Sequence, residues 1–222
     1  MSSRDEIRRL AQQSIDRGDA TGWFEELYQG ASGNWDRVPW ADRAANPFLV
    51  EWLGSQGARA SGAPCLVVGC GLGDDAEALS AAGFRVVAFD ISRTAVDACR
   101  SRFPESTVEY VEADALAPPA AWAGRFDLVF ESYTLQVLPP AARAVATAAL
   151  AALVSPGGRL LVLCRARDRD EPVGELPWPL LREELDAFCD HGLGQVSCES
   201  FFDDEEPPVR RFRALYQRPA VS

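Results

Sequence analysis

The sequence contains no lysine and only one histidine. All 22 basic residues are arginine, and the single imidazole is His191. A phosphate-binding P-loop, a pyridoxal Schiff base and a protein kinase each need a lysine at a defined position, so these classes are excluded. A multi-histidine metal site is excluded in the same way, and a Ser-His-Asp triad would have to use His191. We therefore expect no metal.

Positive charge is scarce overall. The 222 residues include 33 acidic ones, which leaves a formal net charge of −11 and a pI near 4.6. Nucleic acids and anionic membranes attract basic surfaces, so neither is expected as a partner. A hydrophobic content of 47% with 25% charged residues is typical of a globular chain. The length favours a single domain over residues 1–222.

Long apolar segments and cysteine pairs are also missing. The first residues, MSSRDEIRRL, are charged, and the longest mostly apolar run, Ala144 to Val154, is shorter than the ~20 residues that a membrane span needs. The six cysteines are scattered and contain no CxxC pair, which favours reduced, mostly buried thiols. These features predict a cytoplasmic protein, either a monomer or a homodimer.

The N-terminal region is rich in aromatic residues. Apolar residues recur at helical spacing from Ser3 to Arg17, which predicts an amphipathic helix. Four of the six tryptophans follow within thirty residues: Trp23, Trp35, Trp40 and Trp52. We predict a helical, aromatic-rich cap over residues 1–60 and a core over residues 61–222. The simpler interpretation is that these rings only fasten the helices to the core.

Short β-rich runs alternate with helical stretches from Cys65 onward, as in repeated βαβ units, so we predict an α/β fold with a parallel sheet. The predicted strands are Cys65 to Val68, Arg85 to Phe89, Val108 to Val111, Phe126 to Phe130 and Arg159 to Cys164, and the helices are Asp75 to Ala82, Thr94 to Phe103 and Ala141 to Leu153. A helix from Leu180 to Asp190 then precedes two strands, Gln195 to Phe201 and Arg210 to Gln217. No helix separates those two strands, so they form an antiparallel hairpin.

A glycine-rich turn follows the first predicted strand and contains Gly69, Gly71 and Gly73. Ligands of open α/β sheets bind at this carboxyl edge, although a tight structural turn would give the same pattern. A dinucleotide fingerprint has Gly or Ala three positions after Gly71, whereas this chain has Asp74. A carboxylate there would repel a pyrophosphate and suits a cofactor with positive charge. A nicotinamide dehydrogenase is therefore disfavoured.

Two further strand ends carry carboxylates. Asp90 ends the second strand and precedes Ile91, and it is placed to accept both hydroxyls of a ribose. Its alternative role is to cap the helix beginning near Thr94. Asp114 and Ala115 follow the third strand, where an adenine amino group would donate to Asp114. These three strand ends together predict a nucleoside site.

The motifs VVGCGLG, VVAFDIS, VEADAL, FDLVFE and LVSPGGRLLVL over residues 65–164 resemble the class I S-adenosylmethionine-dependent methyltransferases. The resemblance implies a Rossmann-like fold with a seven-stranded sheet in the order 3-2-1-4-5-7-6 and the last strand antiparallel. It implies S-adenosylmethionine as cofactor and S-adenosylhomocysteine as product. It also implies that Glu131, after the fourth strand, contacts the cofactor's amino group.

The N-terminal elements Gly22-Trp23, Gly30 and Trp35-Asp36 resemble the thiopurine and thiol S-methyltransferases, with Leu27 in place of a second tryptophan. By that resemblance Trp23 and Trp35 cover the cofactor's methionyl end, where an aromatic face attracts the cationic sulfonium. Trp178 stands where those relatives have a proline-aromatic loop, so it lines the acceptor pocket. The resemblance leaves open what holds the cofactor's carboxylate.

Methyl transfer from a sulfonium is an in-line displacement that depends chiefly on alignment and exclusion of water. A thiol ionises readily at neutral pH, whereas an alcohol needs a positioned base. The candidate proton acceptors are Asp36, Tyr28 and Tyr133, each with ordinary hydrogen bonding or packing as its alternative. His191 is predicted to lie at the opposite, amino edge. Arg37 would favour an anionic or thiolate acceptor.

These observations predict a small-molecule methyltransferase whose acceptor is a thiol. The alternative keeps the cofactor and methylates an oxygen or nitrogen of an aromatic or quinol-like metabolite. A catalytically silent adaptor with the same fold is the hypothesis from another class.

Overall fold

The computed structural model describes residues 3–55 and 60–220. Three short segments lie outside the described residues: 1–2, 56–59 and 221–222. All three fall in the predicted single domain, and the first two also fall in the predicted cap. The backbone divides into two compact units, Met1–Ala115 and Leu116–Ser222.

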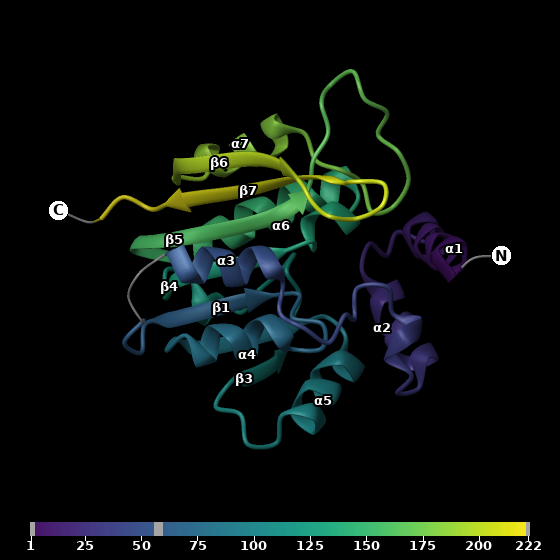
Figure 1. The fold of residues 1–222 in the computed structure, drawn as a ribbon, viewed down its shortest axis with the longest axis horizontal. Helices are drawn as coiled ribbons and strands as arrows, with labels where there is room; N and C mark the ends of the chain where they lie inside the picture. Colours follow the sequence, from purple (N-terminus) through teal and green to yellow (C-terminus); the bar gives the residue numbers. More distant parts are fainter. Residues whose placement is uncertain (1–2, 56–59, 221–222) are drawn as a thin grey trace. The chain divides into compact units, whose positions relative to one another are not determined.

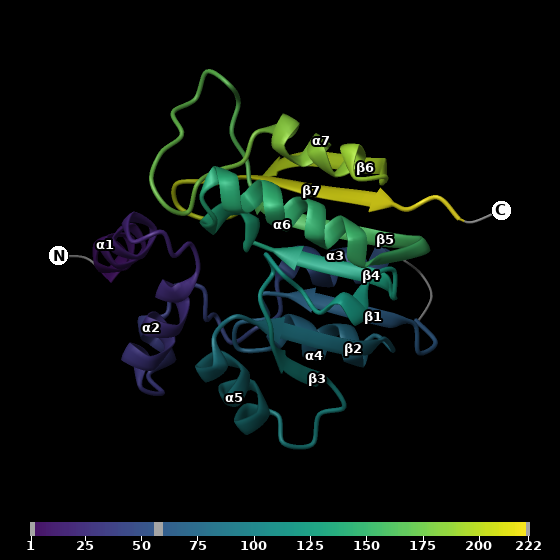
Figure 2. The same ribbon diagram turned by 180° about the vertical axis from the view of Figure 1, so that it is seen from behind.

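The first unit begins with helices that come together near one end of its strands. Helix α1 (Ser3–Asp16) contacts α2 (Gly22–Ala31), and α2 contacts α5 (Arg93–Arg102), as Figures 1 and 2 show. A short 3-10 helix η1 (Trp35–Arg37) and helix α3 (Pro47–Ser55) follow α2. The predicted helices of the N-terminal region are thereby confirmed.

Three parallel strands form the rest of the first unit. They are β1 (Pro64–Val68), β2 (Arg85–Asp90) and β3 (Glu109–Glu112), and α4 (Asp74–Ala81) connects the first two. The register pairs Val68 with Phe89 and Asp90 with Glu112. Because the strands are parallel and in this register, their carboxyl ends meet at one edge, as the sequence predicts. β1 is buried along nearly its whole length, which explains its continuous apolar run.

The second unit holds the remaining four strands, β4 (Phe126–Ser132), β5 (Val154–Arg165), β6 (Gly194–Phe202) and β7 (Arg210–Gln217). β4 and β5 are parallel, and β7 is antiparallel to both β5 and β6. Helices α6 (Pro140–Leu153) and α7 (Arg182–Asp190) contact each other and cover one face of these strands (Figure 2). The 3-10 helices η2 (Ala120–Trp122) and η3 (Leu135–Val137) lie in the connections.

The strand order is β3-β2-β1-β4-β5-β7-β6. This order and the antiparallel β7 confirm the predicted Rossmann-like fold class and the helix-free hairpin at the C-terminus. Most predicted elements match within two residues. β5 begins five residues earlier than predicted because Val154 already pairs with Phe126 across a register shift. Gly157 in this segment has a left-handed backbone, with φ at +80°. The resulting irregularity interrupts the alternation of side chains by which a strand is recognised in a sequence.

Two further expectations concern cysteines and membrane spans. All six cysteines are free; four are buried, whereas Cys189 is exposed and Cys198 half-buried. Among the described helices, none combines the length and the hydropathy needed to cross a bilayer.

Candidate functional site

The turn after β1 requires glycine at three positions. Gly69, Gly71 and Gly73 have φ values of +59°, +54° and +90°. A Cβ on Gly73 would come within 2.6 Å of the Tyr110 hydroxyl oxygen, and one on Gly71 within 3.2 Å of the Tyr28 hydroxyl oxygen. The turn therefore combines left-handed backbone with close neighbours, which explains the glycine spacing in the sequence.

Asp90 at the end of β2 binds this turn directly. Its Oδ2 accepts a hydrogen bond from Gly71 N and its Oδ1 accepts one from Ser92 N, both at 2.9 Å. The side chain is buried, and burial raises the pKa of Asp90 to about 6 although both N–H groups stabilise its charged form. Ser92 caps α5, since its Oγ accepts from Ala95 N at 3.1 Å. The alternative role of Asp90 as the helix cap is thus wrong.

The third strand end lies beside the second. Ala113 N donates to Asp90 O at 3.0 Å, which brings the segment after β3 to the end of β2. Asp114 and Ala115 follow at once, and both are half-buried, as is Ile91. The glycine turn, Asp90 and Asp114 are therefore neighbouring features of one edge in the first unit.

Asp74 has a charged partner that the sequence did not reveal. Its two carboxylate oxygens accept from the Arg102 guanidinium at 2.8 and 2.9 Å, and the same guanidinium donates to Leu72 O. The charge of Asp74 is compensated within the protein. The expectation that Asp74 offers free negative charge to a cofactor needs correction, because a bidentate arginine neutralises it. The neighbouring Asp75 accepts from Asn46 N at 2.6 Å, and burial raises its pKa to about 6.

The aromatic residues of α2 are packed inside the first unit. Trp23 is fully buried, stacks on Phe24 with ring centroids 3.9 Å apart, and meets Trp40 edge-on at 6.0 Å. Its indole Nε1 finds no hydrogen-bond partner among residues 3–55 and 60–220. A buried donor without a partner is costly, so it marks a position where a ligand acceptor would be stabilising.

Tyr28 and Trp35 continue this cluster. The Tyr28 hydroxyl oxygen accepts from Trp40 Nε1 at 2.9 Å, and the Trp35 ring lies edge-on to Tyr28 at 6.3 Å. Burial, with Asp90 nearby, raises the pKa of Tyr28 well above its ordinary value. Tyr28 therefore stays protonated at neutral pH, which disfavours its predicted role as a proton acceptor.

Asp36 and Arg37 lie on the surface of η1. The Asp36 side chain is 74% exposed and pairs with Arg43 at 2.9 Å. Arg37 is exposed, and its Nη1 donates to Gly30 O at 2.9 Å. Both predicted residues thus make local surface contacts.

Glu131 in β4 of the second unit is fully buried. Its Oε1 accepts from Thr134 N at 2.6 Å and from Leu135 N at 2.9 Å. Its Oε2 is buried and has no hydrogen-bond partner within the described part of the chain. Burial raises the pKa of Glu131 to about 7, against the opposing effects of these N–H groups and of Arg143.

Tyr133, just after β4, has an uncommon backbone conformation. Its φ is +62°, a region that a bulky residue seldom adopts. The Arg211 guanidinium lies 4.9 Å from the Tyr133 ring centroid and is held by Asp203 and Glu205. Arg211 is not among the residues predicted from the sequence, although four acidic residues, 203–206, precede the Arg210-Arg211 pair.

Trp178 lies in the loop between β5 and α7, and Gln136 fixes this loop at two points. The Gln136 carbonyl oxygen accepts from Trp178 N at 2.8 Å, and the buried Gln136 Oε1 accepts from Arg165 N at 2.6 Å. Arg167 Nε also donates to Pro179 O at 3.2 Å. Gln136 is a second residue that sequence analysis missed, because a glutamine between apolar residues carries no motif.

The remaining polar candidates lie elsewhere. His191 is exposed and ends α7 ahead of β6, which places it at the amino end of that strand. In the described part of the chain, no three His, Cys, Asp or Glu side chains are grouped so that they could hold a metal ion.

Comparisons with known proteins agree with this arrangement. A family model described as a methyltransferase domain matches residues 65–158. The chain is 37% identical over 117 residues to a ubiquinone biosynthesis O-methyltransferase of Aromatoleum aromaticum, covering 52% of this chain and 49% of the relative. The chain spans about half the length of the ubiquinone biosynthesis O-methyltransferases that it matches. It is 30% identical over 166 residues to "Probable thiol methyltransferase 2" of Arabidopsis thaliana, covering 73% of this chain and 67% of the relative.

Solved structures share the fold. The N-methyltransferase NodS of Bradyrhizobium japonicum, in complex with S-adenosylhomocysteine, aligns with a TM-score of 0.68 and 19% identity over 88% of this chain and 98% of its own. A protein associated with the conversion of a disulfide bond into a thioacetal group during echinomycin biosynthesis aligns with a TM-score of 0.72 and 20% identity over 91% and 93%. At these identities the likeness concerns the fold.

Proposed function

The chain belongs to the class I S-adenosylmethionine-dependent methyltransferases, and from this premise we propose that it methylates a small-molecule thiol. The observation that carries the cofactor assignment is the buried Glu131 Oε2, an acceptor without a partner in the described residues. When bound, S-adenosylmethionine supplies an activated methyl group on a cationic sulfur.

The residues of the first unit fit the nucleoside part of this cofactor. Asp90 would accept from the ribose hydroxyls, beside the glycine turn whose backbone allows close approach. Asp114 would accept from the adenine amino group, with Ile91 and Ala115 as apolar neighbours of the base. These roles remain predictions, supported by the joining of the β2 and β3 ends through Ala113 N and Asp90 O.

The methionyl part needs an acceptor for its amino group and a donor for its carboxylate. Glu131 Oε2 supplies the acceptor. In the first unit, the buried Trp23 Nε1 is a donor without a partner within residues 3–55 and 60–220. The faces of Trp23 and Trp35 would favour the sulfonium, an interaction worth roughly 1–2 kcal/mol when desolvated.

A thiol acceptor is favoured because the candidate bases are poorly suited to deprotonating an alcohol. Burial raises the pKa of Tyr28, and Asp36 is exposed and paired with Arg43. A thiol with a pKa near 8.5 already provides some thiolate at neutral pH. The relative named as a thiol methyltransferase supports the same acceptor. Trp178 would line its pocket, and Arg37 would favour its negative charge on approach.

A quinol oxygen is the second candidate acceptor. The similarity to ubiquinone biosynthesis O-methyltransferases favours it. A phenolic hydroxyl ionises less readily than a thiol, so this reaction would need Tyr133 or another base to take its proton. The net charge of −11 disfavours nucleic acid as the acceptor, so a small molecule is the better candidate.

The test is an acceptor panel. The purified protein is incubated with S-adenosylmethionine and thiols, quinols or aromatic amines, and S-adenosylhomocysteine release and product mass are measured. We expect methylated thiols, with activity strongly reduced in Glu131→Gln, because the amide oxygen would bind the Thr134 and Leu135 N–H groups and leave an NH2 donor in place of the free acceptor. Exclusive O- or N-methylation would replace the thiol assignment, and no turnover together with no binding of S-adenosylhomocysteine would favour the adaptor hypothesis.

A further inference from the structure

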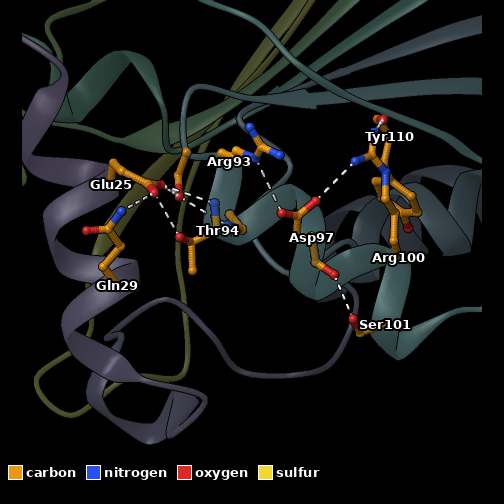
Figure 3. A network of polar contacts seen from close by, with 10 residues as sticks. Glu25, Gln29, Arg93, Thr94, Asp97, Arg100, Ser101 and Tyr110 are labelled. Carbon is orange, nitrogen blue, oxygen red and sulfur yellow. Dashed lines mark hydrogen bonds and ion pairs between the residues drawn. The ribbon is translucent and has the colours of Figure 1, made fainter.

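A single carboxylate on α2 joins this helix to the beginning of α5. Glu25 Oε2 accepts from Ser92 Oγ at 2.5 Å and from Thr94 N at 3.1 Å, while Oε1 accepts from Thr94 Oγ1 at 2.8 Å (Figure 3). Gln29, one turn along α2, donates to the same Oε1 at 2.7 Å. The two oxygens therefore accept four hydrogen bonds, three of them from the first residues of α5 and its cap.

The position of this contact stabilises the charged carboxylate. The amino end of a helix presents unpaired N–H groups and a partial positive charge, which favour an anion there. Burial raises the pKa of Glu25, but the hydrogen bonds from Ser92, Thr94 and Gln29 together outweigh it, so the pKa lies below its ordinary value. The contact is thus made by an ionised Glu25 at neutral pH.

Helix α5 is attached to β3 through Arg100. Asp97 pairs with Arg93 at 3.6 Å and with Arg100 at 3.1 Å, and Arg100 Nη2 donates to Tyr110 O in β3 at 2.6 Å (Figure 3). Glu25 therefore fastens α2 to an element that is tied to the strands.

The same contact leads to the proposed ribose acceptor. Ser92 donates through Oγ to Glu25 and through its backbone N to Asp90. Asp90 in turn accepts from Gly71 N. A continuous chain of hydrogen bonds connects α2, the cap of α5, Asp90 and the glycine turn.

Helix α2 covers the turn that this chain reaches. Tyr28 and Ala31 of α2 pack in one buried cluster with Leu72 of the turn and Ala95 and Ala98 of α5. Gly71, Leu72 and Gly73 are buried, and Asp90 is only 6% exposed. Because α2 packs on this buried turn beside Asp90, its movement would open a path to Asp90, and Glu25 makes polar contacts that hold α2 there.

We propose that Glu25 is a latch: its hydrogen bonds to Ser92 and Thr94 hold α2 closed over the glycine turn, and their release limits the rate at which the cofactor and its product enter and leave. Glu25 is a positioning residue, since it acts through Ser92 and through α2. The identity of the ligand rests on the proposed function. The attachment of α2 by Glu25 does not depend on it and can be tested in the ligand-free protein.

The main experiment measures both rate constants for S-adenosylhomocysteine by stopped-flow tryptophan fluorescence, with Trp23, Trp35 and Trp40 as internal probes. Glu25→Gln keeps the size of the side chain and removes its charge. We expect association and dissociation to quicken together by about tenfold, because the uncharged amide weakens the hydrogen bonds to Ser92 and Thr94, with a nearly unchanged Kd. Thr94→Val removes one hydrogen bond and should quicken both about threefold.

The matched control is Glu26→Gln. Glu26 is the next residue of α2, and its carboxylate pairs with Arg17 at 3.3 Å on the surface. It should leave both rate constants within twofold. Faster dissociation with unchanged association in Glu25→Gln would make Glu25 an ordinary part of the binding surface and overturn the latch, as would unchanged rates in both directions.

Hydrogen exchange of the α2 amides in the ligand-free protein separates the two proposals. The latch predicts about tenfold faster exchange in Glu25→Gln than in Glu26→Gln, whether or not S-adenosylhomocysteine binds. If the wild-type protein binds no S-adenosylhomocysteine, the proposed function fails and the exchange rates alone decide the latch. Equal exchange in the two variants would overturn it.

Discussion

Each of the two units has a buried carboxylate close to the end of a strand, and the two carboxylates differ in how their oxygens are hydrogen-bonded. Asp90 has both oxygens bound by backbone N–H groups of its own neighbourhood, whereas Glu131 has one oxygen bound and the other without a partner in the described chain. Burial raises both pKa values, to about 6 and about 7. Asp90 therefore has a structural role in the turn in addition to its proposed contact with a ligand. Glu131 has an acceptor oxygen available for a ligand, and its burial without a second partner is energetically unfavourable.

The largest effect is expected at Asp90. In Asp90→Asn the amide oxygen can serve only one of Gly71 N and Ser92 N, and the amide nitrogen faces the other donor. Loss of a charged acceptor and distortion of the turn should raise the Kd for S-adenosylhomocysteine about 100-fold, measured by calorimetry. Asp186→Asn, on the exposed side of α7, is the control and should stay within twofold. Wild-type affinity in Asp90→Asn would remove Asp90 from the site.

The second-largest effect is a pH dependence of the unfolding free energy, and it tests whether Glu131 is desolvated in the folded protein. Because burial raises the folded-state pKa of Glu131 from 4.5 to about 7, the folded protein holds this proton more tightly than the unfolded chain. The resulting stabilisation is complete below pH 4.5 and is lost as the pH rises through about 7. Relative to Glu131→Gln, the wild-type protein should lose roughly 2 kcal/mol of unfolding free energy between pH 5 and pH 8.

Urea unfolding of both proteins at the two pH values measures this difference. Asp90 and Asp75 titrate in the same range, but they are common to both proteins and cancel in the comparison. Parallel pH dependence in the two proteins would mean that Glu131 is not held in a desolvated state. The contrast between the two carboxylates would then disappear.

A smaller effect is expected where Gln136 fixes the Trp178 loop of the second unit. Gln136→Met keeps the size but leaves Arg165 N without its side-chain acceptor. If Trp178 lines the acceptor pocket, KM for the acceptor should rise about fivefold, with kcat and the Kd for S-adenosylhomocysteine within twofold. Gln217→Met, which removes an exposed side-chain contact to Gly157 O, is the control. A change confined to kcat would argue against a positioning role.

The strands and their ends were predictable because periodicity and glycine spacing are local signals. The pattern placed the turn at Gly69 to Gly73 and the carboxylate at Asp90 correctly along the sheet edge. The partners of the charged groups were not predictable. Arg102 lies 28 residues from Asp74, and Glu25 lies 67 residues from Ser92, so only the folded chain brings them together. The free oxygen of Glu131 was equally hidden, since it depends on which backbone N–H groups the following turn presents.

The smallest effect is expected at Asp36, the surface counterpart of the two buried carboxylates. Its side chain is 74% exposed and its ion pair with Arg43 is solvated, and such pairs contribute at most about 1 kcal/mol. Asp36→Asn should therefore change kcat less than twofold and leave the pH profile of kcat/KM unchanged. A general base would lose about 100-fold or more on the same substitution. A loss of that size, measured with the acceptor identified in the panel, would mean that η1 turns Asp36 inward when the acceptor binds, and proton removal by the protein would then become part of the mechanism.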